Sequence, residues 1–271
     1  MGAFLRLCCD LPRLLIPAGA AILIACDATG PGTPRRFTLS VMNKSAGARS
    51  AVVSPTGVSA DVRIGSGANS IQITKVEFVL AEIQLSQAGP CSNTHENEDD
   101  DDCDELDLDP ILVDLSLDGS PPKKVLDAVV PAGTYTQLQA ELHAVRADTE
   151  DDEDNDEKVA ATFLASHPSW PSGVSVRVAG VYTDAGGATH DFTFTSRVSA
   201  ELEMDFPSPI TVGDQTTNLT LTVDVGSWFK NAAGAVIDPT NGANANAINA
   251  NIRRSFKALE DDDQDGEDDD R

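Results

Sequence analysis

Aromatic side chains are scarce in this chain of 271 residues: nine Phe, two Tyr and two Trp make up 5% of it. The apolar fraction is nevertheless 41%, which is enough for a hydrophobic core and excludes a wholly disordered chain. We therefore expect a core made mainly of Val, Leu, Ile and Ala. The length fits one large β domain or two smaller ones.

Basic residues are also few: 19 Lys and Arg stand against 44 Asp and Glu, and the formal net charge is −25. Three acidic clusters, at residues 96–109, 148–157 and 260–270, hold 27 of the 44 acids, so the rest of the chain is close to neutral. Runs of like charge repel each other and cannot pack, so we expect them in solvated loops and a tail. Because nucleic acids are polyanions, this charge argues against nucleic-acid binding.

Catalytic motifs are absent from the sequence, which has no Gly-x-Ser-x-Gly elbow, His-Glu-x-x-His motif, P-loop or dinucleotide-binding glycine motif. Ser120 and Lys123 have the spacing of an S-x-x-K nucleophile, but the two prolines between them favour a loop over the helix that this chemistry needs. The histidines are scattered and expected to be exposed and without a special role: His95, His143, His167 and His190. The sequence therefore predicts no enzymatic activity.

The N-terminal apolar run, residues 14–25, is twelve residues long, well short of the roughly 20 that a membrane-spanning helix needs. With Arg6 and Arg13 before it, the run predicts that residues 1–25 are a secretory signal peptide. Residues 26–36 follow and are rich in Gly, Pro and Thr, a composition typical of a flexible tether.

The sequence Leu23-Ile24-Ala25-Cys26 resembles the bacterial lipobox, in which a small residue precedes an invariant cysteine. The resemblance implies that the signal peptide is cut before Cys26 and that this cysteine carries acyl chains such as palmitate. Two or three chains anchor a protein stably, because each buried methylene contributes about 0.8 kcal/mol. The expected protein is lipid-anchored on a cell membrane or outer membrane, facing the periplasm or the exterior. An ordinary signal peptide with a chance cysteine is the alternative.

From residue 37 onward the dominant hydrophobic period is two, which is typical of β-strands. Residues 174–182 and 191–198 flank a glycine-containing turn and predict a hairpin. Residues 71–85 change phase near Lys75 and near Ala81, which predicts one bent strand with a bulge or two short strands. We expect residues 37–259 to form a mainly β domain, an antiparallel β-sandwich of the transthyretin-like or Ig-like kind. Two sub-domains divided near residue 165 are the alternative.

One short helix is expected near the C-terminus. Four apolar residues recur there at helical spacing: Ile248, Ile252, Phe256 and Leu259. This stripe is expected to pack on the sandwich. Because negative charge is unfavourable at a helix C-terminus, residues 260–271 are expected to form a frayed, disordered acidic tail.

Three segments between residues 73 and 145 resemble a family of bacterial lipoprotein domains, the domain of unknown function 4382 family. They are ITKVEFVLAEIQL, ILVDLSLDGS and VVPAGTYTQLQAELHAV, and the most specific match is Pro131, Ala132, Gly133 and Tyr135. The resemblance covers about half of the mature chain, and the acidic insertion around residues 91–103 departs from the family pattern. It implies an exported, transthyretin-like sandwich and no catalytic residues.

Cys91 and Cys103 are the cysteines left over once Cys26 is lipidated and residues 1–25 are removed. In an oxidising compartment two nearby thiols usually form a disulfide, and closing a loop of this size contributes about 3 kcal/mol through loop-closure entropy. A metal site formed by Cys91, His95 and Cys103 is the alternative, although the spacing matches no usual zinc pattern.

The C-terminal sequence contains Asp261, Asp263, Asp265 and Gly266, the spacing of the first half of an EF-hand-like calcium loop, with Asp269 as a further ligand. The bidentate acid expected at the twelfth position would fall beyond Arg271. A plain solvated tail without a cofactor is the alternative to this calcium site.

Two functions follow from these features. The first is a non-enzymatic, lipid-anchored envelope protein whose β-sandwich binds an unknown protein or envelope partner or has a structural role. The second is a calcium-binding, adhesion-type module that uses the acidic clusters.

Overall fold

The computed structural model describes residues 35–45, 52–54, 57–59, 61–87, 109–130, 133–146, 154–212, 217–261 and 263–267, all within one unit, Gly32–Arg271. The strands are β1 (Arg35–Asn43), β2 (Val52–Ser54), β3 (Gly57–Ser59), β4 (Val62–Ile64), β5 (Ser70–Gln87), β6 (Ile111–Asp114), β7 (Lys123–Val130), β8 (Gly133–Leu142), β9 (Val176–Thr183), β10 (Thr189–Ser196), β11 (Ala200–Val212), β12 (Thr217–Val223) and β13 (Phe256–Glu260). The helices are α1 (Asp154–Ser166), α2 (Val225–Trp228), the 3-10 turn η1 (Gly242–Asn244) and α3 (Ala245–Arg253).

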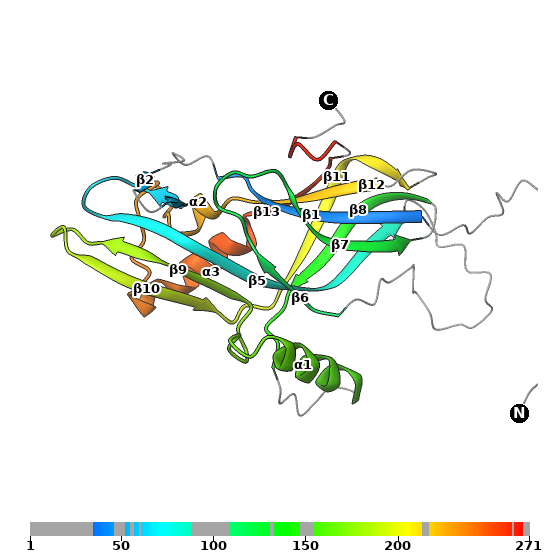
Figure 1. Cartoon of the computed structure of the whole chain (residues 1–271), viewed down its shortest axis with the longest axis horizontal. Helices are drawn as coiled ribbons and strands as arrows, with labels where there is room; N and C mark the ends of the chain where they lie inside the picture. Colours follow the sequence, from blue (N-terminus) through cyan, green and yellow to red (C-terminus); the bar gives the residue numbers. More distant parts are fainter. Residues whose placement is uncertain are drawn as a thin grey trace, which may run out of the picture. The chain divides into compact units, whose positions relative to one another are not determined.

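Two sheets carry the fold (Figure 1). The smaller has the order β13-β12-β1-β7, and its central pair, β1 and β12, is parallel while the outer pairs are antiparallel. The larger has the order β10-β9-β5-β8-β11, with β4 and β6 also paired to β5. Strands from both sides of residue 165 therefore share the larger sheet. The first strand begins at Arg35, two residues inside the expected tether.

One hydrophobic core lies between the two sheets, because the alternating apolar residues of both contribute to a single buried cluster. Phe78 of β5 and Phe256 of β13 meet across it edge to face, with 5.4 Å between ring centroids. Tyr135, at the start of β8, is fully buried in the same core. The predicted β-sandwich is confirmed, with one parallel strand pair that the sequence pattern did not show.

The predicted bent strand is also confirmed. Strand β5 runs unbroken through both phase changes, and its pairing register shifts between Ile73 and Lys75 and again between Ala81 and Gln84. Glu82 lies in the second shift with a positive φ of 50°, a rare backbone conformation for a residue with a Cβ. The predicted hairpin is present as β9 and β10, which pair in register around the turn.

The C-terminal helix is shorter than predicted. Helix α3 ends at Arg253, and Phe256 and Leu259 belong to strand β13, not to the helix. The backbone N–H groups of Arg254 and Ser255 bond three residues back, which tightens and ends the helix. The following segment then completes the edge of the smaller sheet by pairing with β12, which satisfies its backbone hydrogen bonds and buries Phe256.

Helix α1 was not predicted, because the acidic cluster at residues 148–157 was expected to be a solvated loop. The helix begins at Asp154, inside that cluster. Further along, Ala160 and Phe163 pack with Trp170 in a small second core. No helix in the described part of the chain is both long and apolar enough to span a membrane.

Candidate metal-binding sites

Glu82, Glu141 and His143 come together on the larger sheet, and one ligand atom of each lies within 4.8 Å of the other two. Glu141 is near the end of β8 and His143 follows two residues later. Residues two apart in an extended chain point to the same face, so both side chains project together. Glu82 reaches them from the adjacent strand, because Ala81 is paired with Glu141 just before the register shift of β5.

The imidazole of His143 and the carboxylate of Glu141 interact directly, with 3.3 Å between Nδ1 and Oε2. The hydrogen bond from His143 is the main cause that lowers the pKa of Glu141 below its usual value, and hydrogen bonds with Glu82 and Ser199 act in the same direction. Partial burial opposes this shift. Glu141 is therefore held as a carboxylate, the form that a metal ion binds.

Glu82 and Glu141 line an open cleft of about 360 Å³ together with Ser199 and Glu201, and His143 lies beside it. Glu201 on β11 lies directly opposite Glu141 on β8 in the sheet register. Like charges at directly opposite positions of a sheet repel each other. The described lining contains no Lys or Arg, so three carboxylates face the cleft without a cationic side chain among them. A bound cation would relieve that repulsion.

The predicted calcium loop brings three of its four acids together. One carboxylate oxygen each of Asp261, Asp263 and Asp265 lies within 4.8 Å of the others. Asp261 is fully buried and accepts hydrogen bonds from the backbone N–H groups of Asp265, at 2.9 Å, and of Gly266, at 3.1 Å. The buried charge is thus already stabilised by the backbone of the loop.

The start of the expected disordered tail is held against the smaller sheet. Glu260 is the last residue of β13, and the side-chain amide of Gln264 donates to Oδ1 of Asn218 on β12 at 3.2 Å. Lys44 donates from Nζ to the backbone oxygen of Gly266 at 3.1 Å. Because these contacts reach across to β12 and the end of β1, residues 261 and 263–267 are docked on the smaller sheet, and residues 262 and 268–271 lie outside the described part.

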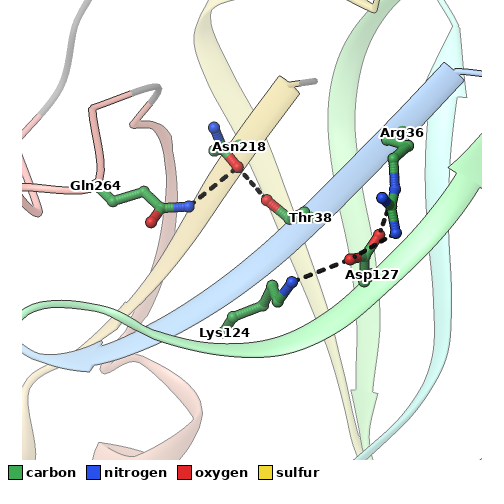
Figure 2. A network of polar contacts seen from close by, with 6 residues as sticks. All are labelled: Arg36, Thr38, Lys124, Asp127, Asn218 and Gln264. Atoms are coloured by element: carbon green, nitrogen blue, oxygen red, sulfur yellow. Dashed lines mark hydrogen bonds and ion pairs between the residues drawn. The ribbon is translucent and has the colours of Figure 1, made fainter. Parts of the chain in front are cut away.

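Figure 2 shows the network beside this loop. Asn218 also accepts a hydrogen bond from the hydroxyl of Thr38 on the neighbouring strand β1. On the next strand, Asp127 of β7 accepts hydrogen bonds from Arg36, at 3.1 Å, and from Lys124, at 3.0 Å. The hydrogen bond from Lys124 is the main cause that lowers the pKa of Asp127, and the positive charge of Arg36 adds to it. These contacts tie β1, β7, β12 and the C-terminal loop together, and both cations, Arg36 and Lys124, share the single carboxylate of Asp127.

We expect the C-terminal loop to respond alike to Ca²⁺ and Mg²⁺, because its innermost carboxylate, that of Asp261, already accepts backbone hydrogen bonds. Isothermal titration calorimetry at about 150 mM salt, where exposed charges are screened beyond about 8 Å, measures this. A saturable site for Ca²⁺ alone, lost when Asp263 and Asp265 are both changed to Asn, would contradict it and support the calcium module.

Sequence reasoning did not single out His143, which was expected to be unremarkable. A signal was present: Glu141-Leu142-His143 places an acid and an imidazole on one face of a predicted strand. The other described histidines have different surroundings. His190 Nε2 lies 2.9 Å from Asp184 Oδ2 in the β9–β10 hairpin, and the His167 ring lies against Phe163.

Five of the candidate site residues lie outside the described residues: the lipid-attachment cysteine, the two cysteines of the expected disulfide, the histidine between them and the last acid of the expected calcium loop. They are Cys26, Cys91, Cys103, His95 and Asp269. Lipidation, the disulfide and the alternative cysteine–histidine metal site therefore stay predictions.

No protein-family model matches this sequence, and neither does any curated protein. The resemblance to the domain of unknown function 4382 family thus stays a prediction. Among solved structures, MbnP from Methylosinus trichosporium is similar at 13% sequence identity with a TM-score of 0.34, and the match covers 78% of this chain and 82% of that one.

Proposed function

We propose that this chain is an exported, lipid-anchored and non-enzymatic binding protein whose β-sandwich holds a divalent transition-metal ion between Glu82, Glu141 and His143. The observation that carries the metal site is the convergence of one imidazole and two carboxylates within 4.8 Å, where both carboxylates also line a cleft. The lipobox-like sequence at Cys26 supports the anchor, and the absence of a catalytic motif in the sequence supports the non-enzymatic role.

The donor set favours ions of the first transition series. Calcium and magnesium prefer sites made of oxygen ligands, whereas imidazole nitrogen suits zinc, copper, nickel and iron. Three protein ligands also leave coordination positions to water, as in open zinc sites. Such a site binds its ion reversibly and fits a protein that captures or presents a metal ion outside the cytoplasm.

In the rest of the proposal, a disulfide joins Cys91 and Cys103, and a protein or envelope component is the partner of the anchored domain. The oxidising compartment that export implies supports the disulfide. The second candidate, a calcium-dependent module, is favoured by the convergence of Asp261, Asp263 and Asp265. We rank this loop second, after the site with His143, because its innermost carboxylate is already bonded to the backbone of the loop.

Replacing His143 with Gln is expected to weaken Zn²⁺ binding by about 100-fold or more, because a lost ligand costs at least as much as the 10–100-fold typical of a lost outer-shell contact. Competition with a chromophoric zinc chelator at pH 7.5 measures the change. His190→Gln is the matched control, since His190 also faces one carboxylate, Asp184, but is not part of a three-ligand cluster.

Thermal unfolding of both variants without metal checks that the fold is intact. Equal zinc affinity in the wild-type protein and in His143→Gln would exclude this site, and so would the same loss in His190→Gln. Glu141→Gln is a second variant of the same site. It removes the charge that His143 faces while keeping the shape of the side chain, and we expect it to weaken Zn²⁺ binding as well.

A further inference from the structure

A second cleft, of about 420 Å³, lies where the ends of β1 and β12 meet α2, α3 and β13. Three of its lining residues are cations, and one is an acid. The lining consists of Lys44, Thr222, Asp224, Ser227, Asn251, Arg254, Ser255 and Lys257. A local excess of positive charge is unusual in a protein whose formal net charge is −25.

The neutral polar groups of this cleft are already used inside the protein. The hydroxyls of Thr222, Ser227 and Ser255 donate to backbone oxygens at 2.7–3.2 Å. The side-chain amide of Asn251 donates to the backbone oxygens of Trp228 and Lys230. The donors that remain for a ligand are therefore those of the charged side chains.

The three cations are not neutralised by ion pairs with the residues that the structure describes. Lys44 has one contact, with the backbone oxygen of Gly266, which leaves two of its three N–H groups. Arg254 donates from one terminal nitrogen to Asn251 Oδ1, 3.0 Å away, which leaves the rest of its guanidinium. Lys257 projects from β13 beside Thr222, its register partner.

We propose that this cleft binds a phosphate group. A guanidinium presents parallel N–H groups that match two oxygens of one phosphate, and two ammonium groups nearby add charge without demanding a fixed direction. Two or three cations suit a dianion better than a single carboxylate. Asp224, the one acid of the lining, lowers the net charge of the charged side chains there from three to two, which still favours an anion. The site is separate from the metal site, and it does not depend on the proposed function.

The test is a calorimetric titration of the full chain with inorganic phosphate at low salt, in buffer with a chelator so that no bound metal ion can bridge the anion. Arg254→Gln is expected to weaken phosphate binding by about tenfold or more, because it removes both a positive charge and the parallel N–H donors of the guanidinium. Lys257→Gln is a second variant with the same expected direction.

Arg253→Gln is the matched control, because Arg253 has the same charge at the same helix end but does not line the cleft. Unchanged affinity in this control supports the site. Equal losses in Arg253→Gln and Arg254→Gln would mean diffuse attraction and would overturn it. Titration with glycerol phosphate shows where the phosphate group comes from. Binding of glycerol phosphate alone supports a phosphomonoester ligand, and binding of both glycerol phosphate and inorganic phosphate supports recognition of the phosphate itself. If neither compound binds, the proposal is overturned.

Discussion

Gly180→Ala is expected to lower the free energy of unfolding by about 3 kcal/mol, the upper part of the range for overpacking a buried site. Gly180 lies in β9 opposite Ile73, at the first register shift of β5. A Cβ at this position would lie 2.3 Å from the backbone oxygen of Gln72 and 3.1 Å from the Cα of Ile73. Because both are backbone atoms of the central strand, the clash cannot be relieved by turning a side chain.

Urea unfolding followed by circular dichroism measures the change in midpoint at constant slope. Gly242→Ala is the control, because no atom lies within 4 Å of a Cβ built there, and it is expected to stay within about 0.5 kcal/mol of the wild-type protein. A Gly180→Ala variant as stable as this control would mean that the bulge of β5 can move away from β9, contrary to the close approach of the two strands.

Cys26→Ser is expected to abolish acylation completely, because a serine hydroxyl does not replace the thiol that the lipobox resemblance assigns to the acyl chains. The precursor then stays uncut or the protein is released from the membrane. The loss of acylation is all-or-none, because Cys26 is the residue to which the lipobox resemblance assigns the acyl chains. Labelling cells with an alkyne fatty acid and separating membrane from soluble fractions measures both outcomes.

A variant with Cys91 and Cys103 both changed to Ser is the control for this labelling. It keeps Cys26, so it should carry as much label as the wild-type protein even though the expected disulfide is gone. Equal label on Cys26→Ser and on the wild-type protein would remove the lipid anchor from the proposed function and leave an ordinary exported protein.

Local sequence patterns were sufficient to predict those features that depend only on which face of the sheet each side chain occupies. The hairpin of β9 and β10 follows from period-two segments around a turn in which Asp184 accepts hydrogen bonds from Gly186 and Ala188. The bulges of β5 follow from two changes of phase, because each inserted residue moves the apolar side chains to the other face. Both the hairpin and the bulges depend on a few consecutive residues, so they can be predicted from the sequence alone.

The C-terminal region shows where local patterns were not sufficient. Phe256 and Leu259 continue the helical spacing of Ile248 and Ile252, yet they form a strand, because the free edge of β12 offers hydrogen bonds that no local pattern reveals. The acids after them were expected to repel each other into solvent. Backbone N–H groups and Lys44 instead stabilise the loop in place, and these partners come from folding.

The period-two pattern was enough to predict a β-sandwich and to put Glu141 and His143 on one face, because side chains alternate along any strand. That Glu82 joins them follows from the fold, since this carboxylate comes from a bulge of β5 on the neighbouring strand. The shared cleft of Lys44, Arg254 and Lys257 follows from the fold in the same way. A strand's own period fixes which way its side chains point, whereas pairing of distant strands fixes which side chains meet.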